Sequence, residues 1–109
     1  MSNVAFNASQ VYNIKESIGF AEGSIVSKII KRDDKGNVTL FSFDKGQNLS
    51  EHTAPFDALV QIIEGTAKVI INKKEYLLHE GEMIIMPADI PHALEAEKPF
   101  KMLLTMLKK

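Results

Sequence analysis

The feature that most constrains this chain is a regular alternation of short apolar runs with turn residues. Runs rich in Val, Ile, Leu and Phe are interrupted at intervals of about 8 to 12 residues by Asp, Asn, Gly and Lys clusters, a spacing typical of a β-sandwich or β-barrel. No segment carries the pattern of a long amphipathic helix. The predicted strands span residues 24–31, 38–43, 58–63, 66–71, 75–79, 83–86 and 100–107.

Alternation within the last of these strands predicts two different faces. Every second residue from Phe100 to Met106 is apolar and is expected to face the core. The opposite face carries Leu103 and Leu107, and the same parity turns Leu59 outward. This outer apolar face indicates either a partner subunit or an ordinary two-layer interior.

Length and composition restrict the class of protein. The chain has 109 residues, which favours one domain, with an N-terminal arm and leading strand over residues 1–23 and a barrel over 24–109. The formal net charge of −1 argues against a nucleic-acid or membrane-surface partner. The chain has no cysteine, which excludes disulfides and thiolate metal sites. With no recognisable signal peptide or membrane-length apolar run, a cytoplasmic location is expected.

The three histidines differ in their surroundings. His79 precedes a Glu-Gly turn and is interpreted as an exposed turn residue. His52 lies six residues after Gly46 and thirteen before Gly65. This spacing to the two glycines sets His52 apart from His79.

His92 lies eleven residues after Gly81 and five after Pro87, which is a second characteristic spacing. Together the two spacings resemble the paired motifs of the cupin family, and the resemblance extends over most of the chain. Membership of that family implies an all-β, single-domain, conserved-barrel fold of the double-stranded β-helix or jelly-roll type. It also implies a homodimer with sheets packed across the interface.

The chain departs from the family pattern at several positions. In metal-binding cupins, two histidines and a glutamate of the first motif join one histidine of the second motif around a divalent ion. Here the second histidine position is Ala54 and the glutamate position is Ala58. The second motif has Asp89 in place of its second glycine and Ala96 in place of its asparagine. Two of the four ligand positions therefore remain, at His52 and His92.

One interpretation is a metal site with a reduced ligand set. His52 and His92 would hold a divalent ion such as Zn, Ni, Mn or Fe, with water or substrate completing its shell. Strict alternation turns Asp57 away from these histidines. A bulge at Pro55 would swing Asp57 toward His52 and make a facial triad.

The other interpretation needs no metal. Two neutral imidazoles in a small barrel can hydrogen-bond the carboxylate or hydroxyl of a small organic molecule. Parity then predicts an apolar pocket wall around the pair. Its members are Val60, Ile62, Ile84, Met86, Leu94 and Met102.

Three functions follow from these interpretations. The first is a small-molecule-binding cupin. The second is a metal-dependent enzyme of isomerase, decarboxylase or dioxygenase type that acts on a small organic acid or sugar. The third is a structural module whose barrel is filled by its own side chains. No catalytic residue is assigned, and the fold alone names no substrate.

Overall fold

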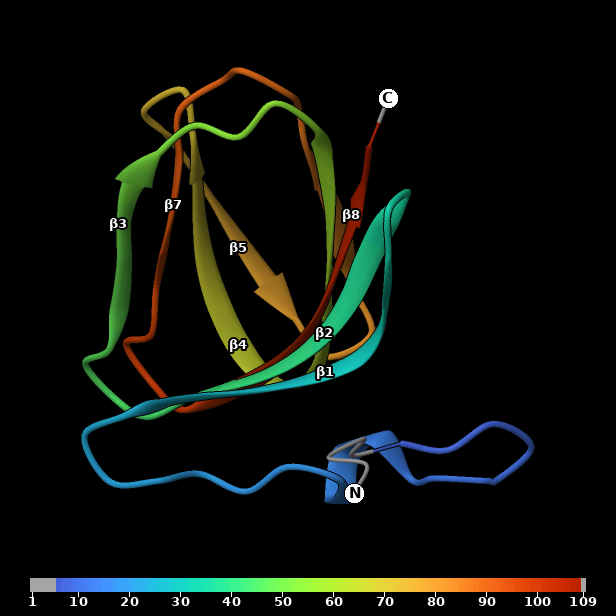
Figure 1. Ribbon diagram of the computed structural model, residues 1–109. Helices are drawn as coiled ribbons and strands as arrows, with labels where there is room; N and C mark the ends of the chain where they lie inside the picture. Colours follow the sequence, from blue (N-terminus) through green and yellow to red (C-terminus); the bar gives the residue numbers. More distant parts are fainter. Residues whose placement is uncertain (1–5, 109) are drawn as a thin grey trace.

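In the part of the chain that the structure describes, eight strands form two curved sheets that share one long strand (Figure 1). The computed structural model describes residues 6–108. The strands are β1 (Ile25–Asp33), β2 (Gly36–Phe43), β3 (Asn48–His52), β4 (Asp57–Ile71), β5 (Lys74–His79), β6 (Met83–Met86), β7 (His92–Glu95) and β8 (Phe100–Leu107). Sheet A has the order β1-β2-β8-β4-β6, and sheet B has the order β3-β7-β4-β5, with every pairing antiparallel. The chain is therefore all-β, as its sequence predicts.

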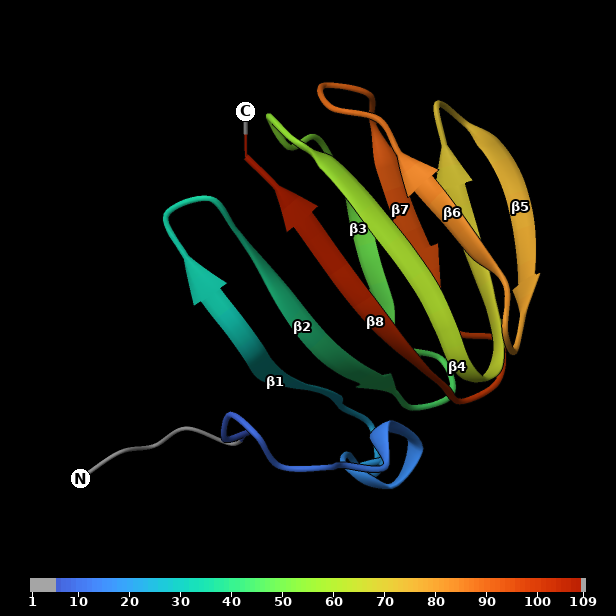
Figure 2. The same cartoon turned by 90° about the vertical axis from the view of Figure 1, so that its right-hand side faces the viewer.

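Strand β4 belongs to both sheets, which corrects one prediction (Figure 2). The sequence predicts two strands separated by a turn at Glu64 and Gly65, but the chain continues as one strand of 15 residues. Its register with β8 shifts between Ile62 and Glu64, and Gly65 has a φ of +80°. A bulge and a left-handed glycine increase local twist, so they turn the strand from sheet A into sheet B without ending it.

Two strands, β3 and β7, were not predicted from the sequence pattern. β3 has one apolar residue, Leu49, among five, and β7 has only four residues. Both lie in sheet B, where β3 forms an edge and pairs with β7. A short or polar strand carries too little periodicity to be recognised alone, and tertiary pairing determines its conformation.

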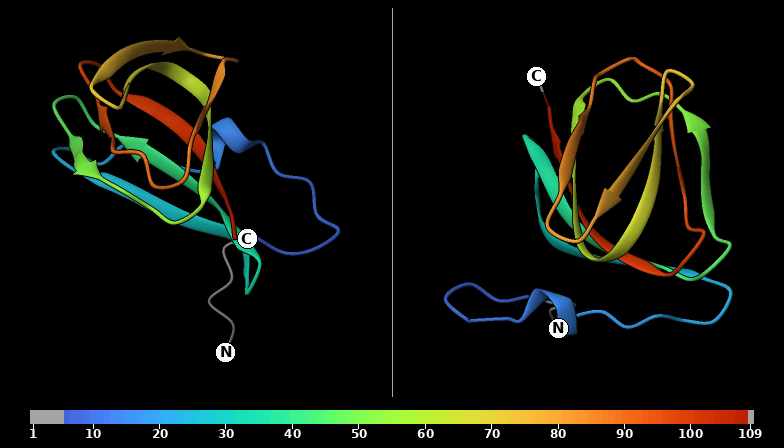
Figure 3. Two further views of the ribbon diagram at one scale, coloured as in Figure 1. Left: turned by 90° about the horizontal axis from the view of Figure 1, so that it is seen from above. Right: turned by 180° about the vertical axis from the view of Figure 1, so that it is seen from behind.

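The two curved sheets face each other (Figure 3). Apolar side chains from both sheets fill the interior between them. The rings of Phe43 and Phe100 stack within this cluster, with centroids 4.5 Å apart. The residues predicted by parity to face the interior do so. Val60, Ile62, Met86, Leu94 and Met102 are all buried, and Ile84 packs against them half-buried.

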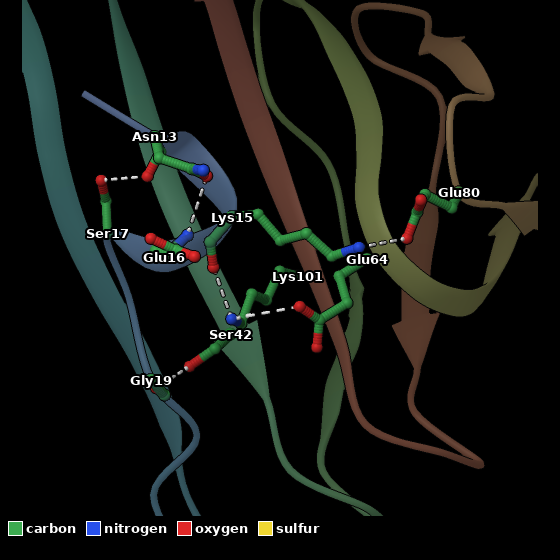
Figure 4. A network of polar contacts seen from close by, with 9 residues as sticks. All are labelled: Asn13, Lys15, Glu16, Ser17, Gly19, Ser42, Glu64, Glu80 and Lys101. Carbon is green, nitrogen blue, oxygen red and sulfur yellow. Dashed lines mark hydrogen bonds and ion pairs between the residues drawn. The ribbon is translucent and has the colours of Figure 1, made fainter. Parts of the chain in front are cut away.

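The N-terminal segment crosses the outer face of sheet A (Figures 1 and 4). It contains the 3-10 helix η1 (Ile14–Glu16) and the buried Ile18. Residues 6–23 contain no strand, so the predicted leading strand is absent from them; residues 1–5 lie outside the described part. Within residues 6–108, no helix has the length and apolarity needed to cross a bilayer.

Candidate functional site

The two motif histidines come together at one end of sheet B. His52 ends β3 and His92 begins β7, and the two are register partners between these strands. Their Nε2 atoms are 3.2 Å apart, and the ring centroids are 4.4 Å apart at an interplanar angle of 68°. Two histidines that are 40 positions apart in sequence therefore lie in contact.

Backbone carbonyl groups fix the orientation of both rings. His52 Nδ1 lies 2.8 Å from the carbonyl oxygen of Ser50, and His92 Nδ1 lies 3.2 Å from that of Ile90. A carbonyl oxygen can only accept, so each Nδ1 donates its proton. In a neutral ring with Nδ1 protonated, Nε2 carries a lone pair and accepts. With both protons on Nδ1, the two Nε2 atoms face each other as acceptors.

The pair extends from the interior to the surface. His92 is 4% exposed, whereas His52 is an exposed residue. Burial lowers the pKa of His92 below its ordinary value of 6.5, the Ile90 carbonyl opposes this, and the neighbouring His52 adds to the lowering. The neutral form of His92 is therefore favoured near pH 7, and a ligand would reach the pair from the His52 side.

Two loops hold the histidines in place. Asp57 Oδ1 accepts the backbone N–H of Ala88 at 2.8 Å. The backbone N–H of Asp89 donates to the carbonyl of Ala54, also at 2.8 Å. These bonds join the segment after β3 to the segment before β7. The structure thus gives Asp57 a loop-ordering contact, and sequence reasoning missed it because strand parity says nothing about loop hydrogen bonds.

His79 lies elsewhere, as its sequence context predicts. It is exposed at the end of β5, and its Nδ1 is 3.3 Å from the Thr66 hydroxyl. Both residues line a cavity of about 270 Å³ on the outer face of sheet B, together with Lys68 and Leu77. This cavity is distinct from the histidine pair, and no motif in the sequence indicated it.

Comparison with known proteins identifies the family. A family model for the cupin domain matches residues 39–106, and the chain belongs to this family. A conserved protein of unknown function from Streptococcus pyogenes is 34% identical, with a TM-score of 0.91 over 100% of this chain and 96% of that one. A cupin superfamily protein from Desulfitobacterium hafniense is 25% identical, with a TM-score of 0.90 over 96% of both chains.

A third similar structure is a longer protein. A cupin 2 conserved barrel domain protein from Leptotrichia buccalis is 42% identical, with a TM-score of 0.87. The match covers 89% of this chain but 47% of that one, so this chain spans about half its length. A search of curated proteins found no match.

The histidine pair has too few ligand atoms for a resident metal ion. Both rings have the orientation of metal-ligating imidazoles, with Nδ1 on a carbonyl and Nε2 free to coordinate. Protein zinc sites, however, use three or four protein ligands. Within residues 6–108, no group of three or more His, Cys, Asp or Glu side chains is placed to hold a metal ion. The two histidines alone therefore do not fit a resident metal ion.

Proposed function

We propose that this cupin binds a small organic molecule at the rim of the barrel, through His52 and His92. The observation that carries the proposal is the convergence of the two Nε2 atoms at 3.2 Å, with no third protein ligand gathered beside them in residues 6–108. Two preoriented polar atoms beside an apolar interior are typical of a small-molecule site.

The surroundings of the pair support a ligand with an apolar portion. Ile71 is the register partner of His92, and Leu49 is the partner of Leu94 on the neighbouring strands. Both Ile71 and Leu49 are half-buried against the core. The deeper positions predicted as pocket wall are packed into that core, so the accessible part of the site is its rim.

A fragment screen tests the proposal. The His52 and His92 ring signals of ¹⁵N-labelled protein are followed by NMR during titration with small alcohols, amines and organic acids. We expect at least one class to shift both ring signals, and His52→Ala to weaken its binding about ten-fold or more. His79→Ala is the matched control and should bind as the wild type does. Binding that is equally tight in all three proteins would overturn the proposal.

We also propose that two copies pair through the outer face of sheet A. Met83, Ile85 and Leu107 are 50%, 55% and 62% exposed on this face, beside the half-buried Leu59 and Leu103. Such a patch marks an interaction surface. The twofold longer Leptotrichia buccalis relative supports a second barrel as the occupant, because its chain has room for one more domain of this size.

A further inference from the structure

We infer that the histidine pair is a double hydrogen-bond acceptor, which selects ligands that present a hydroxyl or amino group and rejects carboxylates. This inference rests on the proposed function and deepens it by naming the chemical class of the ligand. The inference comes from the two backbone carbonyls that fix the rings. Without them, two neutral imidazoles are compatible with carboxylate and hydroxyl ligands alike.

The polarity of the site follows from a count of protons. Each neutral imidazole has one ring N–H. The carbonyl of Ser50 takes the N–H of His52, and the carbonyl of Ile90 takes that of His92. No N–H then remains for the 3.2 Å contact between the Nε2 atoms. Two lone pairs at this distance repel each other unless a donor group beside the pair shares its proton with them.

An alternative tautomer is less well matched to the same distances. If His92 carried its proton on Nε2, it would donate to His52 Nε2. Its Nδ1 lone pair would then face the Ile90 carbonyl oxygen, also an acceptor, at 3.2 Å. In that arrangement the repulsion is between His92 Nδ1 and the Ile90 carbonyl oxygen instead of between the two Nε2 atoms. Because His92 is almost fully buried, water cannot easily supply a donor to these two acceptors. The same tautomeric shift in His52 would place two acceptors, its Nδ1 and the Ser50 carbonyl oxygen, only 2.8 Å apart.

A further alternative is a protonated pair. An extra proton would satisfy both Nε2 atoms, but burial and the adjacent His52 disfavour a charge on His92. A neutral pair that takes its donor from the ligand fits both the distances and the burial. A hydroxyl or amino group supplies that proton, whereas a carboxylate or an ether brings only further lone pairs.

The position of charged groups agrees with the rejection of anions. Lys73 Nζ lies 3.5 Å from Glu51 Oε1, so the charge of this lysine is offset by the carboxylate of the residue before His52. The polar contacts that the structure gives to the two rings are the carbonyls of Ser50 and Ile90 and the rings themselves. None of these is a cation that would attract a ligand carboxylate.

The test combines tautomer measurement with four matched probes. Long-range ¹H–¹⁵N NMR at pH 7.5 assigns the protonated nitrogen of each ring in the free protein, with His79 as internal control. The probes are cyclohexanol, cyclohexylamine, methoxycyclohexane and cyclohexanecarboxylate, which share one apolar ring and differ in the polar group. We expect Nδ1–H tautomers for His52 and His92. We also expect the alcohol and the amine to bind at least about ten-fold more tightly than the ether and the acid.

The possible outcomes distinguish failure of this inference from failure of the proposed function. An Nε2–H tautomer at either ring of the free protein overturns the inference, even if small molecules still bind. Preferred binding of cyclohexanecarboxylate also overturns it, and leaves the proposed function standing. If none of the four probes or the wider fragment set shifts the ring signals of His52 and His92, the proposed function fails and the inference fails with it.

Discussion

At the scale of single residues, His92 links burial to the pH dependence of stability. Because its pKa is lowered in the folded chain, the unfolded chain binds the proton more tightly. Stability contributed by neutral His92 is therefore complete above the ordinary value of 6.5. It decreases as pH falls through 6.5 and levels off below the lowered pKa. Urea unfolding of the wild type and of His92→Gln at pH 8 and pH 5 measures this difference.

We expect the wild type to lose more stability than His92→Gln between these two pH values. His79→Gln serves as the control, because His79 is exposed and should leave the pH dependence as it is in the wild type. An equal loss of stability in the wild type and in His92→Gln would contradict the account of His92 burial.

Gly65 is the residue that allows β4 to cross between the sheets. A Cβ atom at this position would lie 2.5 Å from the Pro99 carbonyl oxygen, in addition to requiring a φ of +80°. Gly46 has a φ of +84°, but a Cβ there meets nothing within 4 Å. We expect Gly46→Ala to cost about 1 kcal/mol and Gly65→Ala about 3 kcal/mol or more. Thermal and urea denaturation measure both, and equal costs would show that the close approach at Gly65 is relieved.

At the scale of elements, Lys101 attaches the N-terminal segment to sheet A. Its side chain is nearly buried, and Nζ donates to the Lys15 carbonyl at 2.6 Å and pairs with Glu64 at 3.3 Å (Figure 4). The ammonium also lies 5.1 Å from the centroid of Phe20. Lys101→Met keeps the aliphatic stem and removes these contacts. We expect a loss of about 2 kcal/mol and faster amide exchange over residues 13–20.

The control for this prediction is Lys31→Met, an exposed position on the edge strand β1. Hydrogen exchange should rise locally in the Lys101 variant and remain unchanged in the control. Unchanged protection of residues 13–20 in both variants would show that Ile18 and the backbone contacts alone hold the segment.

A strand can be predicted from the sequence only where its own residues have a recognisable apolar pattern. β2 and β8 were predicted to within two residues of their bounds from their runs of apolar and β-branched residues. Both strands bury neighbouring residues that point to opposite faces, such as Ser42 and Phe43, because the N-terminal segment covers part of the outer face of sheet A. The crossing at Gly65 was predicted as a turn, because a glycine after Glu64 has the same local chemistry in a bulge as in a hairpin. β3 and β7 take their extended conformation from pairing with each other and with β4.

The candidate site also has a part that could be predicted from the sequence and a part that could not. The two histidine positions were predicted from the resemblance to the cupin motifs, and the fold places them on paired strands. The contacts that fix their polarity were not predicted, because they are made by main-chain carbonyls at Ser50 and Ile90, whose positions depend on the loop geometry. Asp57 was considered as a third metal ligand, and the structure places its Oδ1 on the Ala88 N–H. The metal, ligand and cytoplasmic assignments stay predictions.

At the scale of the whole molecule, the pairing of two barrels has a direct consequence for mass. One chain is 12.2 kDa, so light scattering behind size exclusion should give about twice that value if the outer face of sheet A is an interface. Ile85→Lys places a charge on the most apolar part of this face and should shift the protein toward the monomer. Lys31→Glu, at the exposed edge of β1, is the matched charge change and should leave the mass unchanged. A wild-type monomer would contradict the pairing.

The account depends on the histidine pair acting through its own lone pairs without a resident metal. The measurement that tests this most directly is the metal content of protein purified without an affinity tag or chelator, compared with the His52→Ala, His92→Ala double variant. We predict far less than one divalent ion per chain in the wild type, with no difference in the variant. Close to one ion per chain, lost in the double variant, would contradict the account and restore the metal-dependent enzyme.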